Sequence, residues 1–337
     1  MKIAVDAMGG DFGPKIPIAG AIQASREFNI EVILVGAENI IHKEFDRLNH
    51  DRANISIINT AEYIGMGEGL ISFRRKKRSS LRVCAQLVKE KQADAFISTG
   101  NSAAIVYISK KILGALNGVE KPALALLVPS GKGPTLLLDV GANANCRPRH
   151  LEQFAVMGHL FMQGVMGLKE PRIALMSIGE EKSKGNELTK EVFKMLKASP
   201  LNFVGNIEGK DIYSGKADVI VSDGFTGNIA LKVSEGVVEN FLSQARSEIM
   251  KNLFSKIGFF LMKRNLKNLY KRMDYSQYGG ALLLGLNGIC VVGHGRSNTQ
   301  AVKNAIGTAK EFVANKVQEK IETEMDGFSQ YFERMKA

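Results

Sequence analysis

The sequence predicts an α/β protein with a doubly wound, mostly parallel sheet and helices on both faces. Two observations lead to this prediction. Short β-branched or apolar runs alternate along the chain with stretches of helical periodicity. Several of these runs end in loops of Gly, Ser, Thr and Asn that open directly into a helix. Such alternation is typical of parallel strands joined by crossover helices.

The elements follow in order along the chain. Strands are expected at 3–5, 31–35, 54–59, 93–98, 123–128, 135–140, 172–177, 202–204, 219–221 and 288–292. Helices are expected at 16–28, 38–48, 80–91, 103–116, 151–166, 187–198, from 228 to about 250, 254–273 and 299–317. The connection 61–80 is long, marked by glycines and basic, which is typical of a functional or mobile loop.

Size and composition favour one large globular unit over residues 1–337, with two lobes around a central crevice as a second arrangement. The chain has 337 residues, of which 45% are apolar. No apolar run approaches the roughly 20 residues of a membrane-spanning helix. No secretory signal is expected at the N-terminus. Three cysteines without metal-ligand spacing indicate ordinary thiols and a reducing cytoplasm.

The stretch 219–232, VIVSDGFTGNIALK, is the clearest example of a strand, a polar loop and a helix start. Four further strand ends carry similar loops, namely MGGDFGP, STGNS, GANANC and GHGRSN. Because the carboxyl ends of parallel strands lie at one edge of a sheet, all five loops are expected to meet in one crevice. The N–H groups at such helix starts favour an anionic ligand.

The positive charge is concentrated in two segments. Residues 74–78, RRKKR, contribute five basic residues, and 251–272 contribute seven without an acid. Together they exceed the net charge of the whole chain, which is +11. A general nucleic-acid-binding surface does not fit this distribution, and we expect no nucleic-acid partner.

Several familiar catalytic patterns are absent. The sequence contains no GxxxxGK[ST], HExxH or CxxC, and GMGEG and GHGRSN lack the last glycine of GxGxxG. GNSAA resembles the GxSxG nucleophile elbow, and Ser102, Asp223 and His294 follow in hydrolase order, but the second glycine is missing. A serine-dependent acyl hydrolase is therefore one alternative, and a non-catalytic adaptor for an anionic membrane or nucleic acid is another.

Seven motifs, in order and over essentially the whole chain, resemble the bacterial acyl-ACP:phosphate acyltransferase family. They are DAMGGDFGP, RRKKRSS, STGNS, LDVGAN, NIEGKD, SDGFTGN and the late GHG. Two departures are Ala103, where glycine is expected, and the missing proline near Gly69. The resemblance implies transfer of a fatty acyl group from acyl carrier protein to inorganic phosphate. The acyl phosphate would then serve a membrane glycerol-3-phosphate acyltransferase in phospholipid synthesis.

The resemblance also implies a fold similar to isopropylmalate dehydrogenases and phosphate acetyltransferases, a homodimer, and no metal or organic cofactor. Phosphate is already nucleophilic at neutral pH, so the site mainly has to hold it and stabilise an oxyanion. The expected oxyanion donors are Lys184, Asn228 and His294. Phosphate is expected at Gly100, Asn101, Ser102, Thr226, Gly227, Gly295 and Ser297. Asp6, Asp11 and Asp223 are expected to orient the loops. A covalent acyl group on Cys146 is a further alternative, although no histidine is paired with it in sequence.

The two basic segments agree with the same hypothesis of an acyltransferase. Acyl carrier protein is acidic, so RRKKR is expected to attract it, with a solvated charge run as the alternative. The segment 254–273 alternates apolar and basic faces at helical spacing, which is typical of a membrane-surface or partner helix. Its docking residues are expected to be Phe259, Met262, Lys263, Leu266 and Lys267. We expect a cytoplasmic protein associated peripherally with the anionic inner surface of the cytoplasmic membrane; burial against a second subunit is the alternative.

Overall fold

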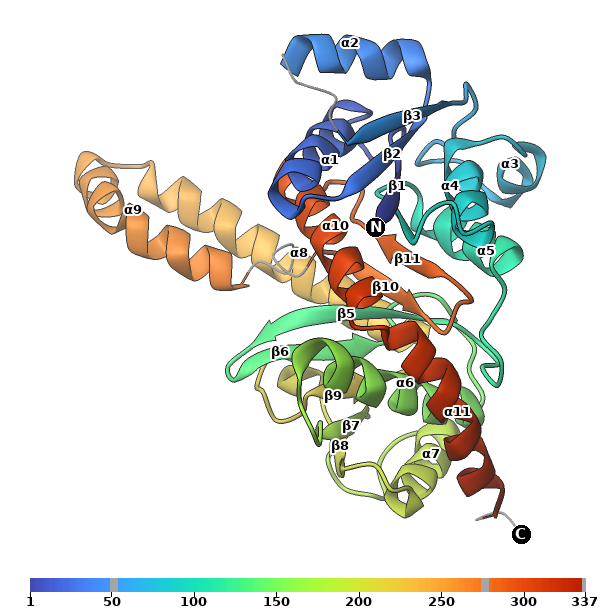
Figure 1. Ribbon diagram of the computed structural model, residues 1–337. Coiled ribbons are helices and arrows are strands. Elements are labelled where there is room, and N and C mark those ends of the chain that lie inside the picture. Colours follow the sequence, from blue (N-terminus) through green and yellow to red (C-terminus); the bar gives the residue numbers. More distant parts are fainter. Residues whose placement is uncertain (49–53, 274–278, 335–337) are drawn as a thin grey trace.

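The computed structural model describes residues 1–48, 54–273 and 279–334, which form one eleven-stranded sheet with helices on both faces (Figure 1). The strands are β1 (Lys2–Asp6), β2 (Glu31–Gly36), β3 (Ile55–Asn59), β4 (Ala95–Ser98), β5 (Ala123–Ser130), β6 (Gly133–Leu138), β7 (Ile173–Met176), β8 (Phe203–Ile207), β9 (Val219–Val221), β10 (Ala281–Leu284) and β11 (Ile289–Val292). The helices are α1 (Lys15–Phe28), α2 (Glu38–Leu48), α3 (Leu70–Arg75), α4 (Ser80–Lys89), α5 (Ser102–Ile112), α6 (Pro148–Met166), α7 (Glu187–Ala198), α8 (Gly224–Ile249), α9 (Leu253–Met273), α10 (Thr299–Ala314), α11 (Val317–Arg334) and the short 3-10 helix η1 (Gly209–Asp211).

The strand order is β3-β2-β1-β4-β11-β10-β5-β6-β9-β7-β8. Strands β3, β2, β1, β4 and β11 are mutually parallel, and so are β6, β9, β7 and β8. The antiparallel pairs are β11 with β10, β10 with β5, and β5 with β6. The prediction of a mostly parallel, doubly wound sheet is therefore confirmed.

The expectation that all five polar loops leave one edge of a parallel sheet is wrong. The hairpin between β5 and β6 reverses the chain, with Ser130 paired to Gly133. Because β10 and β5 are also antiparallel, the group β6, β9, β7 and β8 runs opposite to β1, β4 and β11. The loops after β1, β4 and β11 form one group, and those after β6 and β9 form another.

Two apolar clusters fill the space between the sheet and its helices. One contains residues of α1, α6, α10 and α11, including the fully buried Ile18, Phe154 and Val302. The other contains residues of α4 and α5, including Leu81 and Ile105. Helices therefore cover both faces, as the alternating sequence pattern predicts.

Three elements differ from the sequence expectation. The apolar run before Gly285 forms strand β10, which the sequence pattern did not distinguish from its surroundings. The helix expected at 299–317 ends at Ala314, and Lys316 adopts a left-handed φ of 52° before α11 begins. Part of the long connection 61–80 folds into α3.

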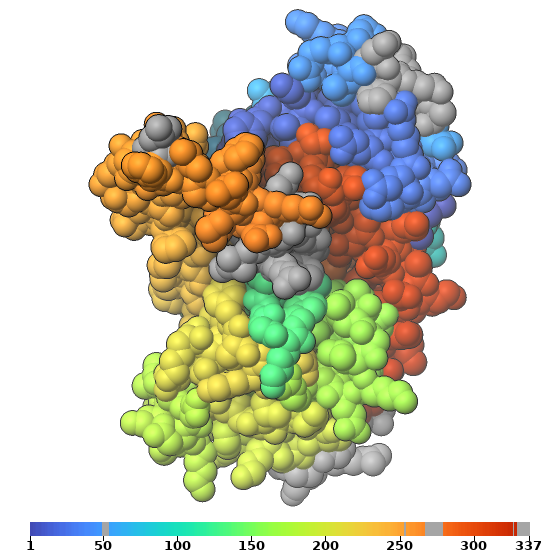
Figure 2. All heavy atoms as spheres, turned by 90° about the vertical axis from the view of Figure 1, so that its left-hand side faces the viewer, coloured from blue at the N-terminus to red at the C-terminus, as the bar shows by residue number. Residues whose placement is uncertain are grey.

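Helices α8 and α9 form an arm that extends from the body of the molecule (Figure 1). The 26 residues of α8 span about 39 Å at the usual rise per residue. The predicted helix at 254–273 is confirmed as α9. The side view in Figure 2 shows the orange surface of α9 facing the viewer. The arm thus places a basic amphipathic segment at the periphery of the fold.

An ion pair clamps the starts of β7 and β9. Arg172 donates from Nε and Nη2 to the two carboxylate oxygens of Asp218 at 3.0 and 2.8 Å, and its backbone N–H adds a bond of 2.8 Å. Burial acts to raise the pKa of Asp218, but the hydrogen bonds and charge of Arg172 bring it below its ordinary value. A bidentate, partly buried pair of this kind fixes both distance and orientation.

We predict that Asp218→Asn lowers the free energy of unfolding by about 1–3 kcal/mol at pH 7. Because the folded-state pKa is depressed, this stabilisation is present above the unfolded pKa of about 3.9 and is lost as the pH falls through the folded value. Urea unfolding at pH 7 and at steps from about 5 towards 3 measures it. The control is Glu31→Gln, since the Lys2–Glu31 pair at 3.2 Å is exposed and should change stability by less than about 0.5 kcal/mol. A difference in unfolding free energy between wild type and variant that does not shrink as the pH falls would contradict the prediction.

Candidate functional site

The loops after β1 and β4 are joined by the buried carboxylate of Asp6. Its Oδ2 accepts a hydrogen bond from the Ser98 hydroxyl at 2.7 Å, and its Oδ1 accepts one from the Met8 N–H at 3.2 Å. Burial raises the pKa of Asp6 above its ordinary value, while these bonds and one from Ser80 act in the opposite direction. Asp6 therefore lies beneath the loops and holds two neighbouring strand ends together.

Backbone contacts join the same loops to the loop after β11. The N–H of Asp11 donates to the Gly295 carbonyl at 2.8 Å, and the Thr99 hydroxyl donates to the Gly9 carbonyl at 3.2 Å. The predicted loop-orienting position Asp11 thus acts through its main chain. The loops after β1, β4 and β11 are thus connected, and the last two of them carry the predicted phosphate positions Gly100, Gly295 and Ser297.

The start of α5 has open hydrogen-bond donors. Asn101 caps this helix, because its Oδ1 accepts from the Ala104 N–H at 3.1 Å. The Gly100 N–H is bonded to the Ser98 hydroxyl at 3.1 Å. The N–H groups of Ser102 and Ala103 have no partner among the described residues, and both residues are exposed. Two free donors at a helix start suit an anionic oxygen.

The start of α8 is different, because all four N–H groups of its first turn are occupied. Phe225 and Thr226 donate to Asp223 Oδ1 at 3.0 and 2.9 Å. Gly224 donates to the Asn143 carbonyl at 2.9 Å, and Gly227 to the Asp223 carbonyl at 3.0 Å. Even the Thr226 hydroxyl donates to Asp223, at 2.8 Å. Of the predicted phosphate contacts, those at Ser102 are thus open, whereas the N–H groups of Thr226 and Gly227 are already bonded.

Gly227 is needed for close packing. A Cβ atom at this position would lie 2.0 Å from the Asp139 carbonyl oxygen, so any side chain would push α8 away from the end of β6. Its neighbour Asn228 is exposed, and its amide has no hydrogen-bond partner among the described residues. The predicted donor Asn228 is therefore accessible at a point where the helix packs closely against the end of β6.

Asp139, which follows β6, is the anchor of the second group of loops. Its carboxylate is fully buried and accepts five hydrogen bonds, from the N–H groups of Leu124, Gly141, Ala142 and Asn143 and from the Asn143 side chain. Burial raises the pKa of Asp139, and the five donors oppose that shift by favouring the ionised form. Asp139 belongs to the LDVGAN motif, but the sequence pattern predicted no role for it.

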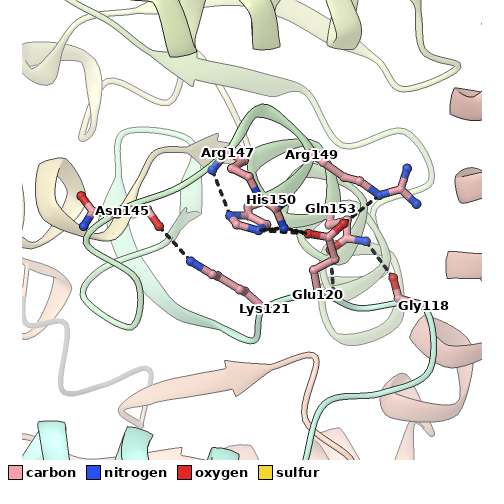
Figure 3. Close-up of polar contacts among 8 residues, drawn as sticks. All are labelled: Gly118, Glu120, Lys121, Asn145, Arg147, Arg149, His150 and Gln153. Atoms are coloured by element: carbon pink, nitrogen blue, oxygen red, sulfur yellow. Dashed lines mark hydrogen bonds and ion pairs between the residues drawn. The ribbon is translucent and has the colours of Figure 1, made fainter. Parts of the chain in front are cut away.

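A second polar cluster, drawn in Figure 3, anchors the end of the same loop. Glu120 accepts from Arg147 at 2.6 Å, lies 3.2 Å from Arg149, and contacts the buried ring of His150 at 3.1 Å. Lys121 donates to the Asn145 carbonyl at 2.9 Å. Burial lowers the pKa of His150, because the charged imidazolium is poorly solvated there. Residues 139–150 are thus held at both ends.

Lys184 lies in the polar loop after β7. Its side chain is exposed and makes no ion pair with a described residue, while its N–H donates to the Glu181 carbonyl at 3.0 Å. Gly185 adopts φ 105° with the Thr189 hydroxyl close by, so a side chain there would be strained and would clash. A salt bridge of 2.8 Å from Lys216 to Glu180 ties the loop to the body. The ammonium group of the predicted donor Lys184 therefore has no ion-pair partner among the described residues, whereas the backbone of its loop is held in place.

His294 connects the first group of loops to α8. Its Nδ1 accepts from the Arg296 N–H at 3.1 Å, so in the neutral ring the proton resides on Nε2. Nε2 lies 3.9 Å from the carboxylate of Glu235 on α8. Burial lowers the pKa of His294, and Glu235 opposes that shift. A neutral ring with its N–H on Nε2 is suited to donate a hydrogen bond.

Helix α8 carries the predicted donor Asn228 in its second turn and Glu235, which faces the predicted donor His294, two turns further on. Asn228 and Glu235 are seven residues apart, or about 10 Å along the helix. Glu235 contacts His294, and Arg296 lies 3.1 Å from Glu239 one turn further on. Sequence reasoning missed Glu235; the signal was its position on the same helical face as Asn228. No hydrogen bond or ion pair between described residues joins Lys184 to Asn228 or His294.

The serine hydrolase arrangement is not assembled. No hydrogen bond between described residues joins Ser102 to His294, whose Nε2 faces Glu235. Asp223 caps α8 instead of supporting the imidazole. The residues that follow in hydrolase order in the sequence therefore have different partners in the fold.

The docking residues expected on α9 are largely exposed. Phe259 and Met262 are 39% and 53% exposed, and Phe254, Phe260 and Leu261 are more so. Lys263 is exposed and Leu266 is half-buried, whereas the side chain of Lys267 lies outside the described residues. Large apolar side chains gathered on one peripheral helix are typical of a contact surface.

The fold belongs to the class that includes phosphotransacetylases. A phosphotransacetylase from Streptococcus pyogenes superposes with a TM-score of 0.62 and 19% identity, covering 95% of this chain and 94% of that one. EutD phosphotransacetylase from Staphylococcus aureus gives 0.59 and 17%, covering 92% and 94%. A 4-hydroxythreonine-4-phosphate dehydrogenase from Klebsiella pneumoniae gives 0.55 and 14%, covering 93% and 99%. At these identities the likeness concerns the fold alone.

The sequence comparisons are more specific. The model of the fatty acid synthesis protein family matches residues 1–320. A phosphate acyltransferase of Thermodesulfovibrio yellowstonii is 48% identical over 321 residues, covering 95% of this chain and 93% of the relative. The phosphate acyltransferase of Geobacter sulfurreducens is 44% identical over 341 residues, covering 100% and 99%. The chain belongs to this family of phosphate acyltransferases, as the motifs predict.

Cys146 is poorly suited to carry an acyl group. Burial, followed by the charge of Asp139, raises the pKa of its thiol to about 11. Its Sγ contacts the Asn143 carbonyl at 3.5 Å. A thiol is nucleophilic only as thiolate, which is scarce at neutral pH when the pKa is this high.

We predict that iodoacetamide at pH 7.5 alkylates Cys146 in the native protein about 100-fold more slowly than a cysteine at the ordinary pKa of 9.0. Peptide mass spectrometry over time measures the rate, and the urea-unfolded protein is the control. Cys146→Ala should keep acyl transfer within about twofold. Rapid native alkylation, or loss of turnover in a folded Cys146→Ala variant, would restore the covalent alternative.

Proposed function

We propose that this enzyme transfers a fatty acyl group from the thioester of acyl carrier protein to inorganic phosphate, forming acyl phosphate for phospholipid synthesis. The observation that carries this proposal is the family match over residues 1–320, together with relatives named phosphate acyltransferase. The free N–H groups at the start of α5 and the accessible side chains of Lys184 and Asn228 provide a chemistry that suits it. We further propose one unit with two lobes, which correspond to the two parallel strand groups.

The reaction requires positioning more than proton transfer. An oxygen of hydrogen phosphate attacks the thioester carbonyl carbon, and the carbonyl oxygen becomes an oxyanion. The C=O bond then re-forms as the C–S bond breaks, and the released carrier thiolate takes up the proton that the phosphate loses. Phosphate is placed at the α5 start, against the N–H groups of Ser102 and Ala103. Lys184, Asn228 and the Nε2–H of His294 serve as oxyanion donors, each typically worth about 10²–10³ in rate.

The basic segment 74–78 is proposed to attract the acidic carrier protein. Lys76 is partly engaged internally, since its Nζ lies 2.6 Å from Glu68 and 2.8 Å from the Tyr63 carbonyl. Arg75, Lys77 and Arg78 are exposed. Exposed charges of one sign raise association rates with a partner of opposite sign.

We place the enzyme in the cytoplasm, at the inner face of the cytoplasmic membrane, where a membrane glycerol-3-phosphate acyltransferase would take up its amphiphilic product. None of the helices in the described residues is both long and apolar enough to span a bilayer. The exposed apolar residues of α9 support peripheral docking. The seven basic residues between 251 and 272 would each add about 1 kcal/mol near an anionic surface.

We assign the proposed homodimer contact to α8. Ile229, Val233, Val237 and Phe241 recur every fourth residue and are 46–70% exposed. A stripe of this kind is self-complementary about a twofold axis, because each copy presents the same face to the other. Membrane and subunit contacts would then use different helices of one arm.

The deciding assay supplies purified enzyme with acyl carrier protein loaded with a long-chain acyl group, with and without phosphate. Acyl phosphate should form only when phosphate is present. Free fatty acid released without phosphate would instead support a hydrolase, and no turnover in either condition would leave a non-catalytic adaptor.

In the same assay we predict that Lys184→Ala and Asn228→Ala each lower turnover by about tenfold or more in a folded protein, because each removes a transition-state donor. Ser102→Ala should be milder, since the backbone N–H groups remain. Circular dichroism and thermal unfolding confirm the fold. A harmless Lys184→Ala beside an inactive Ser102→Ala would reverse the site assignment.

For the membrane we predict that Leu266→Glu releases the protein from vesicles containing phosphatidylglycerol, while dimer mass and soluble acyl transfer are retained. Co-sedimentation and light scattering measure the two effects. Val237→Glu on α8 is the matched variant: it should halve the mass and leave sedimentation largely intact. If Leu266→Glu broke the dimer and left sedimentation unchanged, α9 would be the subunit contact.

A further inference from the structure

A hollow lined by lysines lies along α7, next to the loop that carries Lys184. Its volume is about 670 Å³, and its lining includes Lys182, Lys190, Lys194 and Lys197, with the ring of Phe193 among them. The described residues that line it include no acid. We call this feature the α7 groove.

The lysines of the α7 groove are not neutralised within the fold. All four are exposed, and none makes an ion pair with a described residue. The two acids of α7, Glu187 and Glu191, likewise form no ion pair with these lysines. Within the part of the chain that the structure describes, no acid therefore neutralises the charge of the groove.

Three lysines of the α7 groove lie on one face of the helix, and an aromatic ring lies beside them. Lys190, Lys194 and Lys197 share one face of α7, because they are spaced by four and three residues. Val192 and Leu196 occupy the buried face. Phe193 is half-buried and packs edge-on against Phe203 at 5.3 Å, which gives the groove an apolar wall.

Helix stability explains only part of this pattern. Lys197 lies in the last turn, where the helix macrodipole favours a cation. Lys190 lies in the first turn, where the same dipole disfavours one. A cation at that end is better explained by an anionic partner than by the helix itself.

We propose that the α7 groove is the seat for an acidic helix of acyl carrier protein. The inference rests on the proposed function, which supplies an acidic carrier, and adds where it binds. The 12 residues of α7 extend about 18 Å, so a helix of three turns or more would align its carboxylates with the lysine row. Phe193 would contact the apolar side chains between those carboxylates.

The position of the groove suits delivery of the thioester. Lys182 and Ser183, at one end of the lining, precede Lys184 in the same loop. A carrier seated on α7 therefore lies beside the proposed oxyanion donor. The basic segment 74–78 is in the other half of the molecule (Figure 1), so it steers the carrier from a distance while the α7 groove holds it.

The test is the double variant Lys190→Glu/Lys194→Glu. The matched control is Lys43→Glu/Lys89→Glu, which changes the charge equally at exposed lysines of α2 and α4. Binding of fluorescently labelled acyl carrier protein, followed by anisotropy at low and physiological salt, should weaken at least tenfold in the α7 variant and less than twofold in the control. KM for the acyl carrier should rise in parallel, while kcat and KM for phosphate stay within twofold.

The outcomes separate this inference from the proposed function. If the wild type makes acyl phosphate and the α7 variant binds the carrier normally, the groove assignment is overturned and the function stands. If the wild type binds the carrier through α7 but makes no acyl phosphate, the function fails and the groove stands. Loss of binding to phosphatidylglycerol vesicles or duplex DNA, with carrier binding unchanged, would assign the lysines to another partner.

Discussion

The buried carboxylate of Asp139 is the interaction on which the geometry of the site depends. It lies at the end of β6, just after the sheet has reversed direction, and its five hydrogen bonds set the path of residues 141–143. Asn143 in turn receives the first N–H of α8 and the ammonium group of Lys110. One buried carboxyl group thus positions a loop, a helix start and a contact to α5, because leaving any of its lone pairs unsatisfied would be costly.

Helix α8 begins at this loop and extends across the molecule. Its start is fixed against β6 by Gly227, its fourth turn faces His294 through Glu235, and its far end joins α9 in the peripheral arm. A rigid helix of 26 residues therefore connects the proposed chemistry to the proposed membrane contact. This arrangement would suit an enzyme whose product is amphiphilic, since the proposed donor Asn228 lies at the start of α8 and the proposed membrane helix α9 follows its far end.

The positive charge of the chain is divided among surfaces with different neighbours. Lys76 in the basic segment 74–78 is bonded to Glu68, α9 presents Lys263 beside exposed apolar rings, and the four lysines of the α7 groove have no acidic partner among the residues that the structure describes. Positive charge alone does not distinguish a surface that attracts the carrier protein from one proposed to contact lipid or to bind a protein helix. The apolar residues beside each cluster make that distinction, because they decide which kind of partner can exclude water there.

The sequence by itself determined the α/β class, most elements and the family, because β-branched runs, helix periodicity and loop motifs are local signals. It also marked Lys184, Asn228 and His294, which the structure leaves accessible, though their catalytic roles stay predictions. Only the tertiary structure decided that β5 and β6 reverse the sheet, that the N–H groups at the start of α8 are occupied while two at α5 are open, and that Glu235 faces His294. These features depend on strand direction and on contacts between distant segments, which a local pattern does not encode.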